Sequence, residues 1–336
     1  MTDTDRAAVL VLGDGGWGTA LAMVLKDSEH EDVRVWGYDA EYSREIETTR
    51  RNPRFLADVE IPSGIRFGAD AAELADGVGV VVSVIPTQFL RGALENIRDS
   101  LPASGIYVSC SKGFERQTLE LPSRMIRHCL PASGIAVLSG PSHAEEVSRG
   151  LPTTVVVGSD SPEIARRVQG LFTAPYFRIY TTTDPLGVEI AGASKNVIAL
   201  AAGISDGLGY GDNARAALVC RGASEITRLG AALGARVETF GGLSGIGDLV
   251  ATCTSLHSRN HAVGARIGKG ESLEAILAST RKVAEGVETT RSLHALAEKI
   301  EVELPITAEV HAVLFDGKSP REAVEDLMRR EQKEES

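Results

Sequence analysis

The first half of the chain alternates short aliphatic and β-branched runs with longer segments of helical character. Segments such as Thr19–Asp27 and Gln117–Leu130 are long enough to form crossover helices. Several of the runs are apolar at every position, which is typical of parallel strands covered on both faces. The pattern therefore predicts a doubly wound α/β domain with a mostly parallel sheet. Its seven predicted strands are Ala8–Leu12, Val33–Trp36, Val78–Ile85, Ile106–Cys110, Ile135–Ser139, Thr153–Gly158 and Phe177–Tyr180.

The pattern changes after about Thr183, where strand-like runs nearly vanish and helical stretches continue toward the C-terminus. Within Val188–Ile204 the apolar residues recur at helical spacing and cover much of the remaining surface, which indicates a buried helix. Ser319-Pro320-Arg321-Glu322 has the pattern of a helix start with a capping box. We therefore expect two domains, a doubly wound α/β domain over residues 1–183 and an all-helical domain over residues 184–336.

Composition narrows the function classes. The chain has 35 Lys and Arg against 46 Asp and Glu, a net charge of −11, which disfavours nucleic acid and anionic membranes as partners. The acidic stretch Met1–Arg6 is not typical of a signal peptide, and the apolar runs are too short for membrane insertion. The four cysteines are scattered without metal-ligand spacing. We expect a cytoplasmic protein with reduced thiols and no metal site.

A glycine-rich loop, Gly13-Asp14-Gly15-Gly16-Trp17-Gly18, follows the first predicted strand and precedes a predicted helix. In this pattern Gly13 permits a tight turn and Gly15 lets the backbone approach a pyrophosphate. Gly18 allows the helix to pack closely, and the helix N-terminus faces the anion. The strand and helix on either side favour dinucleotide binding over a plain glycine turn.

Asp39 lies 21 residues after Gly18, close to the spacing of about 20 for a carboxylate that binds the adenosine ribose. A solvated loop aspartate is the alternative interpretation, and Glu41 is a nearby competitor for the role. No arginine stands at positions 37–39 to hold a 2′-phosphate. The sequence therefore favours NAD over NADP as the cofactor, with NADP possible.

Two lysines are candidates for chemistry. Lys112 follows a strand, at the sheet edge where open α/β sheets bind ligands, although a solvated loop lysine is the commoner case. Lys195 lies inside the apolar helix on a face shared with Val188 and Ile198. A buried ammonium is costly unless it is paired, so this position suggests a functional role, with snorkelling to the surface as the alternative.

Three further segments complete the candidate set. Gly241–Leu249 is dense in glycine and places Asp248 at its edge. Ser258-Arg259-Asn260 opens a helix with Ser258 as N-cap, and N–H donors beside a guanidinium suit a phosphate, although an ordinary capped helix explains the pattern too. Ser142-His143-Ala144-Glu145 has the spacing of a capping box.

Taken together, these segments resemble the glycerol-3-phosphate dehydrogenase family. The similarity extends from about residue 9 to about residue 290, with the motifs in the family's order. The resemblance implies a Rossmann-like N-terminal domain, a helical C-terminal domain and an active site between them. It also implies a homodimer that interconverts sn-glycerol 3-phosphate and dihydroxyacetone phosphate and supplies phospholipid synthesis. The matching runs are Gly13–Ala20, Ser111–Gly113, Ser139–Ala144, Gly192–Asn196, Gly245–Leu249, Thr252-Cys253, Ser258–Asn260 and Glu285-Gly286.

The resemblance also implies roles for individual residues. Lys195 matches the general acid/base, and Lys112 and Asp248 are expected to assist it. The positions expected to bind the phosphorylated substrate are Lys112, Gly140, Ser142, Lys195, Asp248, Thr252, Ser258, Arg259 and Asn260. Motif and resemblance together give the expected cofactor positions, which are Gly13, Gly15, Gly16, Trp17, Gly18, Asp39, Lys112, Ala144, Arg259, Val283 and Glu285.

The chain departs from the family pattern at its cofactor loop. Gly16 stands where bacterial members usually have serine, Asp14 is unusually acidic, and Tyr38-Asp39 replaces an arginine-containing stretch. Two other functions stay open. One is a β-hydroxyacid dehydrogenase of the 6-phosphogluconate type, and the other is a non-catalytic regulator that senses NADH. A regulator predicts a damaged substrate side, whereas the expected lysines, Asp248, Arg259 and Asn260 are all present.

Overall fold

A computed structural model describes residues 8–30, 32–131, 133–279, 284–331 and 334. The chain forms two compact units. The first comprises Met1–Lys112 and Glu120–Glu189, and the second comprises Gly113–Leu119 and Ile190–Ser336. The chain enters the second unit briefly at Gly113–Leu119, and its last passage between the units lies within one helix, α8 (Pro185–Gly207). The domain limits 1–183 and 184–336 stay a prediction.

The first unit is built on an eight-stranded sheet in the order β10-β9-β8-β7-β6-β1-β2-β5, parallel throughout except between β8 and β9. All seven predicted strands are present, with ends within two residues of those predicted. The eighth strand, β5, was not predicted, because its short run alternates buried and exposed residues at the sheet edge. The strands are β1 (Ala8–Leu12), β2 (Val33–Trp36), β5 (Ile65–Gly68), β6 (Val78–Ser83), β7 (Ile106–Ser109), β8 (Gly134–Ser139), β9 (Thr153–Gly158) and β10 (Phe177–Thr182).

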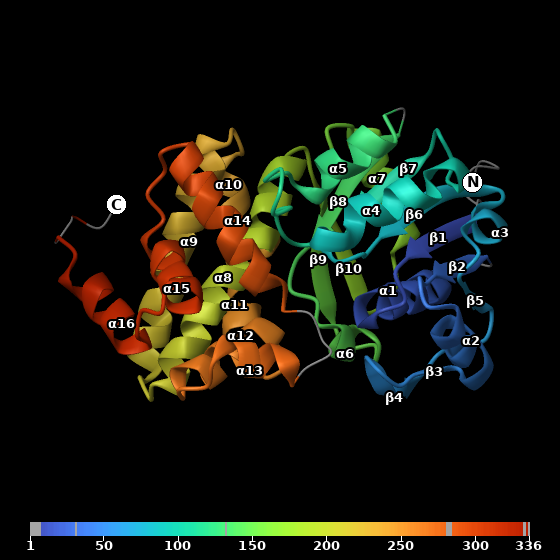
Figure 1. The fold of residues 1–336 in the computed structure, drawn as a ribbon. Helices are drawn as coiled ribbons and strands as arrows, with labels where there is room; N and C mark the ends of the chain where they lie inside the picture. Colours follow the sequence, from blue (N-terminus) through green and yellow to red (C-terminus); the bar gives the residue numbers. More distant parts are fainter. Residues whose placement is uncertain (1–7, 31, 132, 280–283, 332–333, 335–336) are drawn as a thin grey trace. The chain divides into compact units, whose positions relative to one another are not determined.

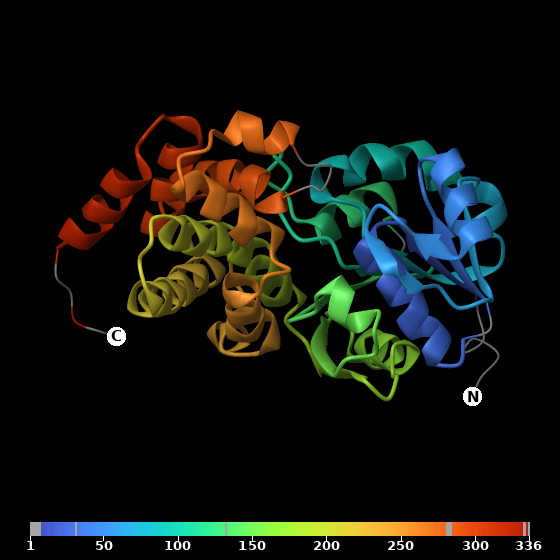
Figure 2. The same ribbon diagram turned by 90° about the horizontal axis from the view of Figure 1, so that it is seen from below.

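Helices cover both faces of this sheet (Figures 1 and 2). On one face α1 (Gly16–Asp27), α2 (Ala40–Thr49) and α7 (Pro162–Leu171) pack against aliphatic residues of the sheet. On the other face α3 (Ala71–Ala75), α4 (Thr87–Ile97) and α5 (Pro122–Cys129) do the same. A short helix, α6 (Ala144–Val147), follows β8, and a two-stranded hairpin, β3 (Arg51–Asn52) with β4 (Leu56–Glu60), follows α2. The doubly wound α/β prediction is confirmed.

The predicted helix Gln117–Leu130 is wrong at its start, because α5 begins only at Pro122. The preceding segment, Gly113–Leu119, belongs to the second unit. There the buried Ser292 hydroxyl donates a hydrogen bond to the Phe114 carbonyl at 3.0 Å. Leu119 then adopts a φ of 62°, which no helix allows. A contact distant in sequence therefore overrides the local helical pattern.

Within the described residues the second unit contains helices and no strand, as predicted. Its longest helix, α8, is long and apolar enough to cross a membrane, but its apolar window is entirely buried within the protein. Such burial is typical of a core helix. The Ser319 capping box is confirmed at the start of α16. The remaining helices are α9 (Asp212–Ala232), α10 (Val237–Phe240), α11 (Asp248–Thr254), α12 (Arg259–Gly268), α13 (Leu273–Ala278), α14 (Glu285–Lys299), α15 (Pro305–Phe315) and α16 (Pro320–Arg329).

Helices α8 and α12 cross with their backbones in contact. A Cβ at Gly203 of α8 would lie 2.1 Å from the His261 carbonyl oxygen, and one at Gly264 of α12 would lie 2.2 Å from that of Leu200. Gly207 and Gly268 are equally close to the opposite helix. Only glycine permits such a crossing, which brings the N-terminal end of α12 toward the middle of α8.

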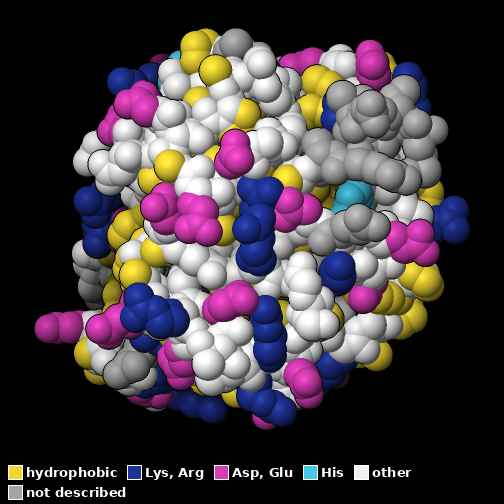
Figure 3. Space-filling view, turned by 90° about the vertical axis from the view of Figure 1, so that its right-hand side faces the viewer, with side chains coloured by type: hydrophobic (Ala, Val, Ile, Leu, Met, Phe, Trp, Pro, Cys, Tyr) yellow, Lys and Arg dark blue, Asp and Glu magenta, His cyan; other side chains and the backbone are white. Residues whose placement is uncertain are grey.

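The surface is mixed in charge. On the face shown in Figure 3, Lys and Arg side chains alternate with Asp and Glu rather than gathering into a block of one sign. A protein that tracks a phosphate backbone needs a basic stripe. This face does not offer one.

Candidate active site

The glycine loop lies at the carboxyl end of β1, where the strand order reverses between β2 and β6. Ligands of open α/β sheets bind at such a switch point. Gly13 has a φ of 116°, and its N–H donates to the Trp36 carbonyl at 2.8 Å. A Cβ at Gly18 would lie 1.9 Å from the Gly13 oxygen, so glycine is required there as well. Helix α1 begins at Gly16, with its first N–H groups at the loop. The loop has the shape that a pyrophosphate needs.

Asp14 does not present its charge on the protein surface. Its side chain is only 7% exposed, and its Oδ2 accepts a hydrogen bond from the Ser43 hydroxyl of α2 at 3.2 Å. The same oxygen lies where a Cβ of Gly37 would be, at 2.1 Å. Burial raises the pKa of this carboxyl above its ordinary value. The acidic side chain in the loop is therefore enclosed by α2 and by the turn after β2.

Asp39 is the N-cap of α2. Its Oδ1 accepts from the Tyr42 N–H at 3.0 Å, and its Oδ2 lies 3.1 Å from Arg54 Nη1. The N–H of Tyr42 and the guanidinium of Arg54 hold the pKa of Asp39 below its ordinary value. Sequence reasoning missed Arg54, because it reaches Asp39 from the β3–β4 hairpin, 15 residues further along.

Lys112, Gly140 and Ser142 meet in the first unit. The Gly140 carbonyl accepts hydrogen bonds from Lys112 Nζ at 3.4 Å and from the Ser142 hydroxyl at 2.8 Å. Gly140 has a φ of 141°, and a Cβ there would lie 2.9 Å from Val155 Cα. A lysine and a hydroxyl thus share one anchor after β7 and β8, at the sheet edge where a ligand is expected.

The capping box at Ser142–Glu145 is wrong. The N-cap of α6 is His143, which makes no side-chain cap, while the Ser142 hydroxyl bonds to Gly140 instead. Ala144 lies against the glycine loop, since a Cβ at Gly16 would be 3.6 Å from Ala144 Cβ. Because Gly16 has no side chain, position 16 packs less closely against Ala144 than it would with the serine that is usual in bacterial members.

In the second unit Lys195 is buried and paired. Its residue is 6% exposed, and its Nζ donates to the Asp248 carboxylate and to the Thr252 hydroxyl, the latter at 2.7 Å. The Thr252 hydroxyl in turn donates to the Asp248 carbonyl at 2.6 Å. Snorkelling is thus ruled out in favour of a desolvated ion pair. Burial also raises the pKa of the adjacent Cys253 thiol to about 12, which leaves it inert.

Asp248 reaches Lys195 through an irregular helical turn, Leu243–Gly247, which precedes α11. Gly245 has a non-helical ψ of −106°, and a Cβ there would lie 2.0 Å from the Phe240 carbonyl oxygen. The glycine density of this segment thus serves the chain's own packing. It orients the carboxylate toward Lys195.

The ends of two helices converge beside Lys195. Ser258 caps α12 by accepting from the His261 N–H at 3.3 Å, which confirms the predicted N-cap. Asn260 Oδ1 accepts from the Gly286 N–H, at the start of α14, at 3.0 Å. A Cβ at Gly286 would also lie 2.8 Å from the carbonyl of Asn196, the residue after Lys195.

The first turns of α12 and α14 therefore lie together with the Lys195 region of α8. Arg259, at the first position of α12, is exposed, and Glu285 begins α14. Val283, predicted to contact the cofactor, lies outside the described residues.

A polar cluster near these helix ends was not predicted. His261 Nε2 lies 2.7 Å from Asp206 Oδ2, and Arg215 Nε donates to both Asp206 oxygens at 3.2 Å. The cluster joins α12, α8 and α9. Its members are far apart in sequence, and no motif marks them.

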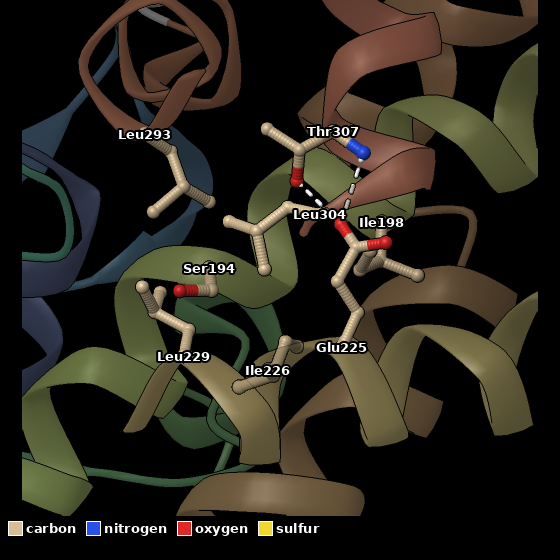
Figure 4. A pocket seen from close by; sticks show the side chains of 8 residues that line it. All are labelled: Ser194, Ile198, Glu225, Ile226, Leu229, Leu293, Leu304 and Thr307. Atoms are coloured by element: carbon tan, nitrogen blue, oxygen red, sulfur yellow. Dashed lines mark hydrogen bonds between the residues drawn. The ribbon is translucent and has the colours of Figure 1, made fainter. Parts of the chain in front are cut away.

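A gap between α8, α9, α14 and α15 is too narrow to admit a water molecule, so it is a packing defect and not a binding site (Figure 4). At its edge the buried Glu225 carboxylate accepts from the N–H groups of Ile306 and Thr307 and from the Thr307 hydroxyl. Among the described residues, no group of three or more His, Cys, Asp and Glu is placed to hold a metal ion.

Two family models account for nearly the whole chain. The N-terminal model of NAD-dependent glycerol-3-phosphate dehydrogenase matches residues 8–165, and the C-terminal model matches residues 184–325. The chain belongs to the NAD-dependent glycerol-3-phosphate dehydrogenase family. This membership favours a glycerol-3-phosphate dehydrogenase over a β-hydroxyacid dehydrogenase of the 6-phosphogluconate type.

Relatives of this family are similar over their full length. Glycerol-3-phosphate dehydrogenase [NAD(P)+] of Geobacillus kaustophilus is 49% identical over 97% of this chain and 96% of its own. The enzyme of the same name from Chlorobium phaeobacteroides is 47% identical over 97% of this chain and 98% of its own. The crystal structure of glycerol-3-phosphate dehydrogenase from Coxiella burnetii matches with a TM-score of 0.93 and 34% identity, covering 97% of this chain and all of that one.

Proposed function

We propose that this protein interconverts sn-glycerol 3-phosphate and dihydroxyacetone phosphate with NAD(H) or NADP(H). The observation that carries the proposal is the buried Lys195, paired with Asp248 and Thr252 in a chain that belongs to this family. A desolvated lysine held by a carboxylate is a costly arrangement that packing alone does not call for. It suits a group that must carry a proton to and from a substrate oxygen.

The cofactor fits the first unit. Gly13 and Gly18 let the loop pack closely, and Gly15 leaves open space for a pyrophosphate at the N-terminus of α1, with Gly16 and Trp17 in the first turn. From the family resemblance we assign Lys112, Ala144, Arg259, Val283 and Glu285 to cofactor contacts as well. When bound, the nicotinamide supplies the hydride that reduces the ketone.

The chain's own residues handle the proton. In the direction of ketone reduction, Lys195 Nζ gives a proton to the oxygen that becomes the hydroxyl, and in the reverse direction it takes that proton back. Asp248 and Thr252 hold Nζ in one position. We assign to Lys112 the role of a second positive charge that stabilises the developing alkoxide. Gly140 and Ser142 are its neighbours in the proposed substrate site.

The substrate phosphate is assigned to the N-terminal end of α12. Oriented N–H groups and the exposed Arg259 guanidinium suit a dianion, and Ser258 and Asn260 fix that end of the helix. Binding the phosphate there orients the ketone toward Lys195.

The deciding experiment is NADH oxidation with dihydroxyacetone phosphate, followed by nicotinamide absorbance and repeated with NADPH. We expect Lys195→Ala to lose about 10²- to 10⁴-fold in turnover while still binding NADH, since loss of a general acid has effects of this size. Lys269→Ala removes an exposed lysine after α12 and serves as the control. Near-full turnover of Lys195→Ala contradicts the assignment.

We also propose that NADH is preferred to NADPH. A carboxylate at Asp39 suits the ribose diol and repels a 2′-phosphate, and no arginine stands at positions 37–39. The ratio of kcat/KM for the two cofactors tests this in the wild type and in Asp39→Arg. A wild type that favours NADPH, or a ratio that Asp39→Arg leaves unchanged, counts against Asp39.

The resemblance supports three further parts of the proposal. We propose that the enzyme is a homodimer, works in the cytoplasm and supplies glycerol 3-phosphate for phospholipid synthesis. Light scattering of the purified protein tests the first of these, because a dimer has twice the mass of the 35.6 kDa chain.

A further inference from the structure

The β3–β4 hairpin is fastened to the glycine loop by one buried side chain. Asn52 is fully buried, and its Nδ2 donates to the Asp14 carbonyl and to the Thr19 hydroxyl, each at 2.8 Å. Its Oδ1 accepts from the Tyr42 hydroxyl at 2.5 Å. The hairpin, found next to α2 in Figure 1, is therefore held in a fixed position against the expected cofactor loop.

Arg54 is held at the tip of this hairpin by three contacts. Its backbone N–H donates to the Tyr42 hydroxyl at 3.1 Å, and its guanidinium lies over the Tyr42 ring at 3.7 Å from the centroid. Its Nη1 lies 3.1 Å from Asp39 Oδ2. The Arg54 side chain is 44% exposed and that of Asp39 is 29% exposed, so solvent and ligands can reach the pair.

The position of Arg54 changes what a nucleotide would meet at Asp39. Both carboxylate oxygens of Asp39 already have partners, the Tyr42 N–H and the Arg54 guanidinium. A 2′-phosphate near this point would therefore face a carboxylate and a guanidinium together, not a lone negative charge. Guanidinium groups bind phosphate by paired hydrogen bonds, and the aromatic ring keeps this one oriented.

We propose that Arg54 is a specificity-determining residue for the cofactor, and that it partly offsets Asp39 and makes NADPH usable. With NADH, Arg54 stays paired with Asp39. With NADPH, the same guanidinium bonds to the 2′-phosphate. The inference rests on the cofactor site of the proposed function and adds a residue that the glycine motif and the spacing rule do not reach.

The experiment compares kcat/KM and equilibrium dissociation constants for NADH and NADPH in four full-length proteins. These are the wild type, Arg54→Gln, Asp39→Asn and the double variant. Asparagine is as good an N-cap as aspartate, so Asp39→Asn keeps the start of α2 while releasing Arg54. Arg44→Gln is the matched control, because it removes the same charge from an exposed position of α2, the helix that Asp39 caps.

We expect Arg54→Gln to lower the NADPH-to-NADH ratio of kcat/KM by about tenfold, the size of one lost charged hydrogen bond. Asp39→Asn should raise that ratio by about tenfold, and by less once Arg54 is already replaced, because the two residues act on one group. NADPH binding should also lose part of its salt dependence in Arg54→Gln. Arg44→Gln should leave the ratio at the wild-type value.

The outcomes separate the two proposals. If the wild type binds neither cofactor, the proposed cofactor site fails and this inference fails with it. If the wild type binds both and Arg54→Gln keeps the wild-type ratio, the role of Arg54 is overturned while the proposed function stands. Should Arg54→Gln not fold, Arg54→Lys tests the same role, because lysine keeps the charge without the planar fork. An intermediate ratio in Arg54→Lys supports the role, and a wild-type ratio overturns it.

Discussion

The contact between α8 and α12 allows a sharp test of how packing sets the active site. We predict that Gly264→Ala destabilises the protein and weakens substrate binding together. The new methyl would lie 2.2 Å from the Leu200 carbonyl oxygen and 2.9 Å from the Ile204 nitrogen, both in the backbone of α8. Neither atom can turn aside as a side chain would, so the two helices must separate.

The size of the effect follows from these distances. An ordinary contact is about 3.5 Å, so the helices must separate by roughly 1 Å. Overpacking of this kind lowers the free energy of unfolding by about 1 to 3 kcal/mol. The better helix propensity of alanine raises it by about 1 kcal/mol. We therefore expect a net loss of up to roughly 2 kcal/mol in the free energy of unfolding.

The same displacement reaches the proposed phosphate site. Helix α12 begins at Arg259, immediately after its N-cap Ser258. Because a misplacement of about 1 Å can cost up to about 10²-fold in rate, we expect kcat/KM for dihydroxyacetone phosphate to fall by at least about tenfold. The glycine loop belongs to the other unit, so a rise in the KM for NADH would report on Arg259, the assigned cofactor position at the start of α12.

Urea unfolding and steady-state kinetics measure both effects. Gly92→Ala is the control, because Gly92 lies inside α4 and no atom beyond its chain neighbours and its own helix backbone lies within 4 Å of its Cβ position. The free energy of unfolding of that variant should be about 0.5 to 1 kcal/mol higher than that of the wild type, and its steady-state kinetics should be unchanged. If Gly264→Ala gains stability as Gly92→Ala does, the helices are not in backbone contact and the reasoning is refuted.

Three buried carboxyls give further predictions. Glu225→Ala should lose about 2 to 4 kcal/mol in unfolding free energy, because it leaves the start of α15 without its acceptor, and Glu225→Gln should lose less. Burial raises the pKa of Glu189 to about 7 from an ordinary 4.5, so its contribution to stability is present below pH 4.5 and is lost as the pH rises through 7. The unfolding free energy of Glu189→Gln should therefore rise above that of the wild type across that pH range, by up to about 3 kcal/mol, as measured by thermal melts. If the difference between the two proteins stays the same at every pH, Glu189 does not titrate in this range. Asp14→Asn should likewise stabilise the protein at neutral pH, with a gain that shrinks as the pH falls toward 3.8, and a gain unaffected by pH contradicts a buried ionised Asp14.

The sequence by itself determined the features that arise from neighbouring residues. Runs of apolar residues marked seven strands, because a strand buried on both faces is apolar at every position. The caps at Ser258 and Ser319 were visible because a cap bonds only two or three residues ahead. The place of Lys195 on an apolar helix face was visible too, because the helical period is local, but whether its ammonium is buried or reaches the surface was left open.

Only the tertiary structure decided what joins residues distant along the chain. It placed Arg54 on Asp39 and turned the Asp14 carboxyl toward Ser43. It also joined Lys195 to Asp248, 53 residues away, an association that only the family resemblance had led us to expect. It also placed Gly113–Leu119 in the second unit, which removed Gln117–Leu119 from the predicted helix Gln117–Leu130. Each of these contacts depends on where packing places a whole helix, strand or hairpin. The residues next to a side chain in the sequence do not specify which distant element packs against it.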